Sequence, residues 1–238
     1  MPAQSNRQKW LREGAIVWRL GWARLRPRLW IIFAIIIAGT LAVLFQNGWD
    51  ESLLKQIRVP ETAPNFAALD RVAGHVSYWG DEMWSVPLAL LIWGAGAIFN
   101  RKRWRQFGWT CLLAFLVATL AVDVFRCGLG RARPNSGLPD GFYGPHVATQ
   151  YQSFPSGHAT TSFATALSLA SASPVLSVPC TVYAVTVGWS RMQLNRHHPL
   201  DVLTGAVLGG FIGLCFAGAL PGRCWRLRRR KKNPGRQP

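Results

Sequence analysis

The chain has 238 residues, enough for one domain of ordinary size, and half of them are hydrophobic although the formal net charge is +17. The lysines and arginines are grouped at the N-terminus, in one short loop and in the C-terminal tail, and long apolar runs separate these groups. A soluble basic protein of this size distributes such residues over its surface. The pattern therefore indicates a membrane protein with basic cytoplasmic ends, and it argues against a nucleic-acid-binding protein.

Residues 1–28 form a basic leader in which tryptophans and aliphatic residues lie among arginines. This composition predicts an amphipathic helix that lies in the membrane interface. Because the leader is long and no small-residue cleavage pattern follows the first apolar run, we expect that run to stay as an anchor.

Six apolar stretches follow that are long enough, or nearly so, to cross a bilayer core about 30 Å thick as helices. They cover residues 29–45, 83–99, 107–125, 159–172, 175–189 and 200–220. The fourth and sixth contain many small residues, which favours close packing between helices over contact with lipid. The sequence therefore predicts an all-α fold, a six-transmembrane-helix bundle over residues 29–220, and a basic cytoplasmic tail over residues 221–238.

The segment between the first two stretches, residues 48–82, is the largest one predicted to lie outside the membrane. Phe66, Leu69, Val72 and Ala73 recur within it at helical spacing. This spacing predicts a helix that lies against the membrane or covers a pocket.

The orientation of the bundle follows from its charges. Most basic residues precede the first stretch, lie between the second and third, or follow the sixth, and in a six-span chain all these places share one side. The positive-inside rule then puts both termini in the cytoplasm. This topology is typical of a bacterial inner membrane protein, whose opposite face is periplasmic.

Charged and polar residues gather at the outer ends of the last four predicted spans. They are Arg126 and Arg133 after the third stretch, Ser156, Gly157 and His158 before the fourth, Arg191 after the fifth, and His197 and Asp201 at the start of the sixth. Charged residues so close to a bilayer are costly and mark functional sites.

The three arginines provide planar guanidinium donors that suit phosphate oxygens. Packing Arg126, Arg133 and Arg191 together without an anion is unfavourable, because two unit charges about 6 Å apart repel by about 3 kcal/mol at an effective dielectric constant of about 20. The backbone N–H groups of Ser156 and Gly157 precede a helix and point toward such an anion. We therefore expect these residues to bind a phosphate.

The histidines supply the remaining chemistry of a phosphoryl-transfer site. His197 and Asp201 are four residues apart and share a helix face, so the carboxylate can fix the tautomer of the imidazole and leave its other nitrogen free to attack. His158, from another helix, is available as an acid toward the leaving oxygen and later as a base toward water. Guanidinium groups take the place that magnesium has in other phosphoryl-transfer enzymes, so no metal and no cofactor are predicted.

These residues resemble the three motifs of the type 2 phosphatidic acid phosphatase family, the lipid phosphate phosphatases. The motifs read Arg126 to Arg133-Pro134, Pro155-Ser156-Gly157-His158, and Ser190-Arg191 to His197 to Asp201. Each spacing matches the family pattern, which most often has Lys at the position of Arg126. The resemblance covers roughly residues 66–220 and leaves the leader and tail outside.

The resemblance implies a membrane-bound, metal-independent phosphatase. His197 attacks phosphorus and becomes a phosphohistidine, Asp201 orients it, and His158 protonates the leaving group. The phosphoryl oxygens are bound by Arg126, Arg133, Ser156, Gly157 and Arg191.

Several alternatives stay open at this point. Phosphatidate, phosphatidylglycerophosphate, undecaprenyl pyrophosphate and lipid A phosphates are all compatible substrates. A phosphotransferase could use the same phosphohistidine, and a transporter or scaffold could bind the same lipid phosphate without chemistry. Arg131 and Arg196 fit further phosphate or sugar contacts as well as they fit ordinary interfacial arginines. The expected partners are a phosphorylated lipid and the membrane lipids, and no oligomeric state is predicted.

Overall fold

The computed structural model describes residues 2–80, 82–169 and 174–217. Across these ranges the chain is helical, and its β-structure is limited to one isolated bridge between Arg131 and Phe142. The helices are α1 (Pro2–Leu25), α2 (Leu29–Leu44), α3 (Trp49–Ile57), α4 (Phe66–Trp79), α5 (Glu82–Ile98), α6 (Lys102–Leu129), α7 (Gly157–Ser168), α8 (Pro174–Gln193) and α9 (Pro199–Ala217). The predicted all-α class is confirmed.

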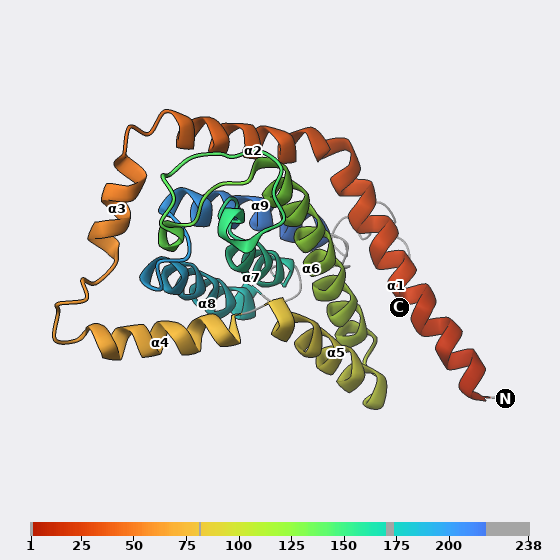
Figure 1. Ribbon diagram of the computed structural model, residues 1–238. Helices are drawn as coiled ribbons and strands as arrows, with labels where there is room; N and C mark the ends of the chain where they lie inside the picture. Colours follow the sequence, from red (N-terminus) through yellow and green to blue (C-terminus); the bar gives the residue numbers. More distant parts are fainter. Residues whose placement is uncertain (1, 81, 170–173, 218–238) are drawn as a thin grey trace.

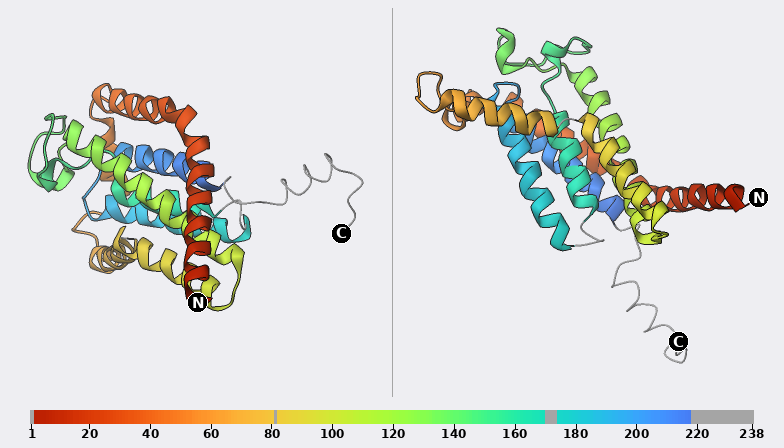
Figure 2. Two further views of the ribbon diagram at one scale, coloured as in Figure 1. Left: turned by 90° about the vertical axis from the view of Figure 1, so that its right-hand side faces the viewer. Right: turned by 90° about the horizontal axis from the view of Figure 1, so that it is seen from below.

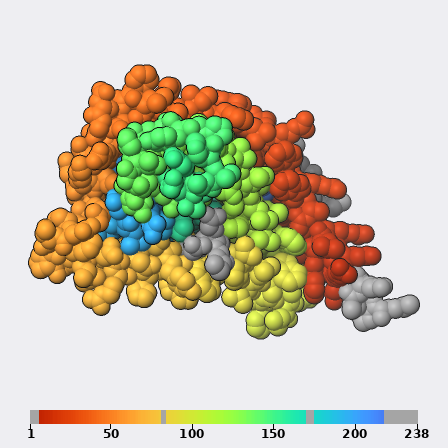
Figure 3. All heavy atoms as spheres, viewed as in Figure 1, coloured from red at the N-terminus to blue at the C-terminus, as the bar shows by residue number. Residues whose placement is uncertain are grey.

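Helices α7 and α9 form the centre of the molecule, and the other helices are arranged around this pair (Figure 1). Helix α6 packs on both, α8 packs mainly on α7, and α2 lies along α9. Helices α3 and α4 run around the edge formed by α8 and α9. The long segment between α6 and α7 projects beyond the same end of the bundle that α4 crosses (Figure 2), and it covers one face in the space-filling view (Figure 3).

Glycines on one face of α9 allow its close packing against α7. A Cβ atom on Gly209 would lie 2.0 Å from the Thr160 carbonyl oxygen, and Cβ atoms on Gly205 and Gly213 would also come within 2.6 Å of backbone oxygens of α7 or its N-cap. The spacing of four residues repeats once per helical turn and puts all three glycines on one face. The close packing predicted from the small residues is confirmed, because only glycine lets the two backbones approach this far.

Large apolar side chains point outward from the helices that surround this centre. Trp30, Phe33 and Ile37 of α2 and Leu120 of α6 are among those that are more than half exposed. Three helices within the described residues are long and apolar enough to cross a membrane, namely Asn6–Leu44, which joins α1 to α2, Lys102–Leu129 and Pro199–Ala217. An apolar surface of this kind identifies an integral membrane protein.

Each of the six predicted apolar stretches coincides with a helix, although the boundaries shift by a few residues. Residues 170–172 and 218–220, at the ends of two predicted spans, lie outside the described residues, as does the predicted tail 221–238. The helix predicted from Phe66 onward is α4 and is confirmed. Helix α3, which precedes it, was not predicted.

The leader is helical, as predicted, and α1 packs on α6 and α9. Glu13 of α1 and Arg105 of α6 form a buried ion pair with an N–O distance of 2.8 Å. A buried arginine with a bidentate carboxylate partner fixes the contact between two helices more specifically than apolar packing does. The leader is therefore joined to the bundle.

Candidate active site

The predicted site residues come together at one end of the bundle, where α6 and α8 end and α7 and α9 begin. The backbone N–H of Ser156 donates to the Asp201 carbonyl oxygen over 3.0 Å, which joins the start of α7 to the start of α9. His158, in the first turn of α7, lies within electrostatic range of Arg126, Arg191 and His197.

The segment that carries Arg133 is folded back over this end of the bundle. Gly130 terminates α6 in the left-handed conformation (φ 62°), and a Cβ atom there would lie 2.0 Å from the Gly144 carbonyl oxygen. Glycine is therefore required at this turn. The turn directs Arg131 inward and brings Arg133 beside the end of α6.

Several buried polar atoms around the site have no hydrogen-bond partner among the described residues. They are Nε of Arg126, Nε of Arg133 and Oγ of Ser156. The ion pair that the described residues provide for the side chain of Arg126 is a long one with Asp123, at 3.7 Å. Buried polar groups are almost always satisfied, so donors left unsatisfied in one place indicate a ligand that accepts hydrogen bonds.

Helix α4, in the segment of residues 48–82, contributes a residue to the site. The Arg191 guanidinium donates through Nη1 to Oγ of Ser77 in α4. This contact orients Arg191 at the end of α8 and connects it to a helix that sequence patterns did not associate with the motifs.

His197 is buried, and a backbone carbonyl fixes its ring. Nδ1 lies 2.8 Å from the Ser153 carbonyl oxygen, whereas the nearest carboxylate oxygen of Asp201 is 3.8 Å away. Because a carbonyl only accepts hydrogen bonds, Nδ1 carries the proton, and in the neutral ring Nε2 keeps its lone pair. His197 and Asp201 lie close together, but the prediction that they share a helix face is wrong, because His197 lies in the turn before α9, which begins at Pro199, and the direct hydrogen-bond partner of Nδ1 is the Ser153 carbonyl.

Burial lowers the pKa of His197 to about 3, and the positive charges of Arg191 and Arg133 add to this effect while Asp201 opposes it. Burial, with the neighbouring charges of Arg126 and Arg196, also lowers the pKa of Arg133 to about 10. At neutral pH the imidazole is therefore uncharged and the guanidinium remains a cation.

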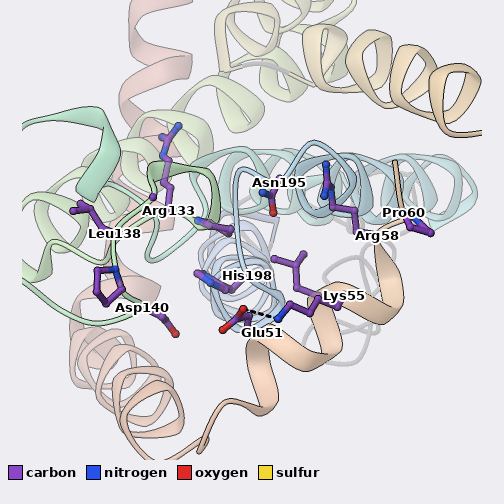
Figure 4. A pocket seen from close by; sticks show the side chains of 13 residues that line it. Glu51, Lys55, Arg58, Pro60, Arg133, Leu138, Asp140, Asn195 and His198 are labelled. Carbon is purple, nitrogen blue, oxygen red and sulfur yellow. Dashed lines mark ion pairs between the residues drawn. The ribbon is translucent and has the colours of Figure 1, made fainter. Parts of the chain in front are cut away.

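Two cavities flank the site. One of about 660 Å³ is lined by His158, Arg191 and Arg196 together with residues of α4. The other, of about 620 Å³, is lined by Arg133 and His198. Figure 4 shows His198 in the second cavity between Arg133 and Glu51, which lies in the first turn of α3. Arg58, just after α3, lines both cavities.

Three residues of this region were missed or left undecided by sequence reasoning. Arg131 is fully buried among the carboxylates of Asp50, Asp140 and Asp201. Neither of its predicted roles, a further phosphate contact or an interfacial arginine, describes this position, whereas Arg196 is exposed beside a cavity. Ser153 was not singled out, and a signal for it is its place three residues before Ser156.

Within the described ranges, no group of three or more histidine, cysteine or acidic side chains could hold a metal ion.

Comparisons with known proteins match the fold and the part of the chain that carries the three motifs. The PAP2 superfamily model matches residues 107–224, which include all three motifs. Phosphatidylglycerophosphatase B of Bacillus subtilis is 30% identical over 198 residues, which cover 77% of this chain and 89% of that protein. The chain belongs to the PAP2 superfamily.

Other relatives agree with this membership. Undecaprenyl-diphosphatase of Sulfolobus acidocaldarius is 28% identical over 192 residues, covering 77% of this PAP2 chain and 86% of that protein. The crystal structure of a transmembrane PAP2-type phosphatidylglycerolphosphate phosphatase from Bacillus subtilis superposes with a TM-score of 0.59 at 26% identity. It covers 87% of this chain and 96% of that one.

Proposed function

We propose that this PAP2 chain, a lipid phosphatase by family, hydrolyses a phosphomonoester or pyrophosphate of a membrane lipid through a phosphohistidine on His197. The observation that carries the proposal is the gathering of two histidines and three arginines from separate parts of the chain at one end of the bundle, beside two cavities. Unsatisfied donors on Arg126, Arg133 and Ser156 support a bound phosphate, with Gly157 and Arg191 completing its ligands.

In the first step, Nε2 of His197 attacks phosphorus, and an N–P bond forms as the P–O bond to the lipid breaks. His158 gives its proton to the leaving oxygen. In the second step, His158 takes a proton from water, the water oxygen bonds to phosphorus, and the N–P bond breaks to release phosphate. The arginines stabilise the negative charge on the transferred group in both steps.

We further propose that residues 29–220 span the bacterial inner membrane six times, with the leader 1–28 and the tail 221–238 in the cytoplasm. The charge asymmetry supports this topology, because the cluster from Arg101 to Arg105 lies at the opposite end of α6 from the site. The site then faces the periplasm. Relatives named for lipid diphosphate and lipid monophosphate substrates support both substrate classes equally.

The test is phosphate release by purified protein from a panel of phosphatidate, phosphatidylglycerophosphate, undecaprenyl pyrophosphate and lipid A. We expect release from at least one lipid, with EDTA present, and a loss of at least about 1,000-fold in His197→Ala. His75→Ala, an exposed histidine on α4, is the matched control and should keep full activity. Phosphate that appears on an acceptor lipid instead of in solution would assign a phosphotransferase. Unchanged activity of His197→Ala would refute the proposal.

A further inference from the structure

Arg131 lies beneath the phosphate-binding residues in a cluster of charges that the proposed chemistry does not use. Its guanidinium binds Asp140 in a bidentate manner at 2.9 and 2.8 Å, Asp50 at 2.8 Å, and Asp201 at 2.6 Å. The side chains of Arg131, Asp50 and Asp201 are fully buried, and that of Asp140 is 18% exposed. With Nε and both amino groups engaged, Arg131 holds carboxylates and is not a ligand for substrate phosphate.

The cluster reaches the nucleophile through Ser153. The carboxylate of Asp201 accepts a hydrogen bond from Oγ of Ser153 at 2.6 Å and from the backbone N–H of His198 at 2.8 Å. The backbone N–H of Ser153 donates to the Arg131 carbonyl oxygen over 3.1 Å. Ser153 is thus held by the guanidinium, through Asp201, and by the backbone of the same arginine. Its own carbonyl then accepts the hydrogen bond from Nδ1 of His197.

Asp50, in the first turn of α3, connects the segment of residues 48–82 to the same cluster. Its second carboxylate oxygen accepts the backbone N–H of Leu200 over 2.9 Å, which caps the start of α9 immediately before Asp201. Gln46 supports both acidic neighbours, since it contacts the backbone N–H of Asp50 at 2.8 Å and the carboxylate of Asp140 at 3.3 Å. The first turn of α9 is therefore held both by Asp50, through the backbone N–H of Leu200, and by Arg131, through the carboxylate of Asp201.

We propose that Arg131 is a positioning residue for catalysis: by holding Asp201 and Ser153 it keeps the Ser153 carbonyl against Nδ1 of His197, so that Nε2 faces the phosphorus atom. The inference rests on the proposed function of His197 as the nucleophile. Asp201 then acts on the imidazole mainly through Ser153. Asp50 acts on it through Arg131 and the start of α9.

The test compares kcat and KM, per folded protein, of Arg131→Lys, Ser153→Ala and the double variant in detergent micelles. A lysine keeps the charge but cannot hold three carboxylates with the geometry of a guanidinium. Arg105→Lys is the matched control, because Arg105 is also a buried arginine with a carboxylate partner but lies at the other end of α6. The fraction of folded protein is measured for each variant by size-exclusion chromatography and thermal unfolding.

We expect Arg131→Lys to lower kcat by about 10- to 100-fold with KM changed less than about threefold, because a displaced nucleophile slows the chemical step and leaves binding intact. Ser153→Ala should lower kcat by a smaller factor. The double variant should be no slower than Arg131→Lys, since both residues act along one path. Arg105→Lys should lose thermal stability and keep its kcat.

A kcat of Arg131→Lys within about threefold of wild type would overturn the inference, as would a change in KM without a change in kcat. The inference also fails if the fold-decrease in kcat of the double variant equals the product of the two single decreases. If Arg131→Lys does not fold, Ser153→Ala decides alone, and an unchanged kcat in that variant overturns the inference. Failure of the proposed function gives a different result: either the wild-type protein releases no phosphate, or His197→Ala releases phosphate as fast as the wild type.

Discussion

The chemistry available to His197 depends on which ring nitrogen carries its proton. The Ser153 carbonyl, at 2.8 Å from Nδ1, accepts only from a protonated nitrogen. A buried imidazole near the guanidiniums of Arg133 and Arg191 also resists a second proton, which is why its pKa falls to about 3. Nε2, the atom proposed to attack phosphorus, therefore keeps its lone pair before any substrate binds.

This leads to a spectroscopic prediction. Because its pKa lies well below the ordinary value of about 6.5, His197 should stay neutral, with the proton on Nδ1, as the pH falls from 7 to 5. Nitrogen-15 NMR of histidine-labelled protein in micelles measures both properties, and the spectrum of His197→Gln assigns the signal. An imidazolium at pH 5.5, or a neutral ring protonated on Nε2, would contradict this description.

Arg133 allows a second prediction at this scale. Burial, together with the like charges of Arg126 and Arg196, lowers the pKa of Arg133 to about 10, so the folded state without ligand contains unfavourable desolvation and repulsion. Vanadate at about 100 times its Kd should stabilise the wild type by about 2.7 kcal/mol, since it binds the folded state. In Arg133→Gln we expect an equal or higher melting temperature without vanadate and little stabilisation with it. Equal stabilisation of both proteins by vanadate would count against Arg133 as a ligand.

The residues that sequence reasoning placed well are those next to the ends of apolar helices. Arg126, His158 and Arg191 lie in the first or last turn of a helix, so a hydropathy pattern already locates them. Arg131 could not be assigned in this way, because its partner Asp50 is 81 residues earlier and its environment depends on tertiary packing. The same holds for Ser153, whose role comes from a backbone carbonyl that no side-chain pattern reveals.

At the scale of elements, the packing of α7 on α9 determines the position of the site. Helix α7 carries His158, the proposed acid, in its first turn, and α9 begins two residues after His197, the proposed nucleophile. Their backbones approach where Gly209 faces the carbonyl oxygen of Thr160. A small change in this distance shifts His158 relative to His197.

Gly209→Ala tests this contact. The added Cβ would lie 2.0 Å from the Thr160 carbonyl oxygen, so the helices must separate, at a cost of about 1–3 kcal/mol. We expect a lower melting temperature and reduced phosphate release. The control is Gly74→Ala in α4, where a Cβ meets no atom within 4 Å and stability should be kept or improved. Wild-type stability of Gly209→Ala would show that the helices pack less closely than described.

The small residues of the fourth and sixth apolar stretches predicted close packing for both helices but not that they pack on each other, and the spacing of Phe66, Leu69 and Val72 predicted α4. The nine-residue α3 escaped prediction because charged residues interrupt its apolar positions. Its importance lies in Asp50, whose buried position in its first turn appears only once the segment folds over the start of α9.

At the scale of the whole molecule, one of the predicted membrane-spanning helices is shorter than the membrane core is thick. The 12-residue helix α7 extends only about 18 Å, well short of a bilayer core about 30 Å thick. Most of its residues are buried among α6, α8 and α9, so its surroundings are protein and not lipid. A hydropathy pattern locates such a helix but does not establish that it crosses the membrane.

Labelling with a membrane-impermeant thiol reagent in intact bacterial cells tests the proposed topology. Asn135→Cys, in the segment between α6 and α7, should react without disrupting the membrane. Arg103→Cys, at the opposite end of α6, should react only after cells are permeabilised, because positive charge favours the cytoplasmic side. Both positions are exposed, and the unsubstituted protein reports the background from native cysteines. The reverse pattern of labelling would place the site in the cytoplasm.

The measurement that tests the central claim most directly is the capture of the covalent intermediate. Purified protein is mixed with a lipid carrying a radiolabelled phosphate, quenched in alkali within milliseconds to seconds, and analysed for label on the polypeptide. We predict label on His197 that is stable to alkali and lost in acid, as for a phosphohistidine, and none in His197→Ala. A protein that turns over substrate without such label, or label that persists in His197→Ala, would contradict a histidine nucleophile at this position.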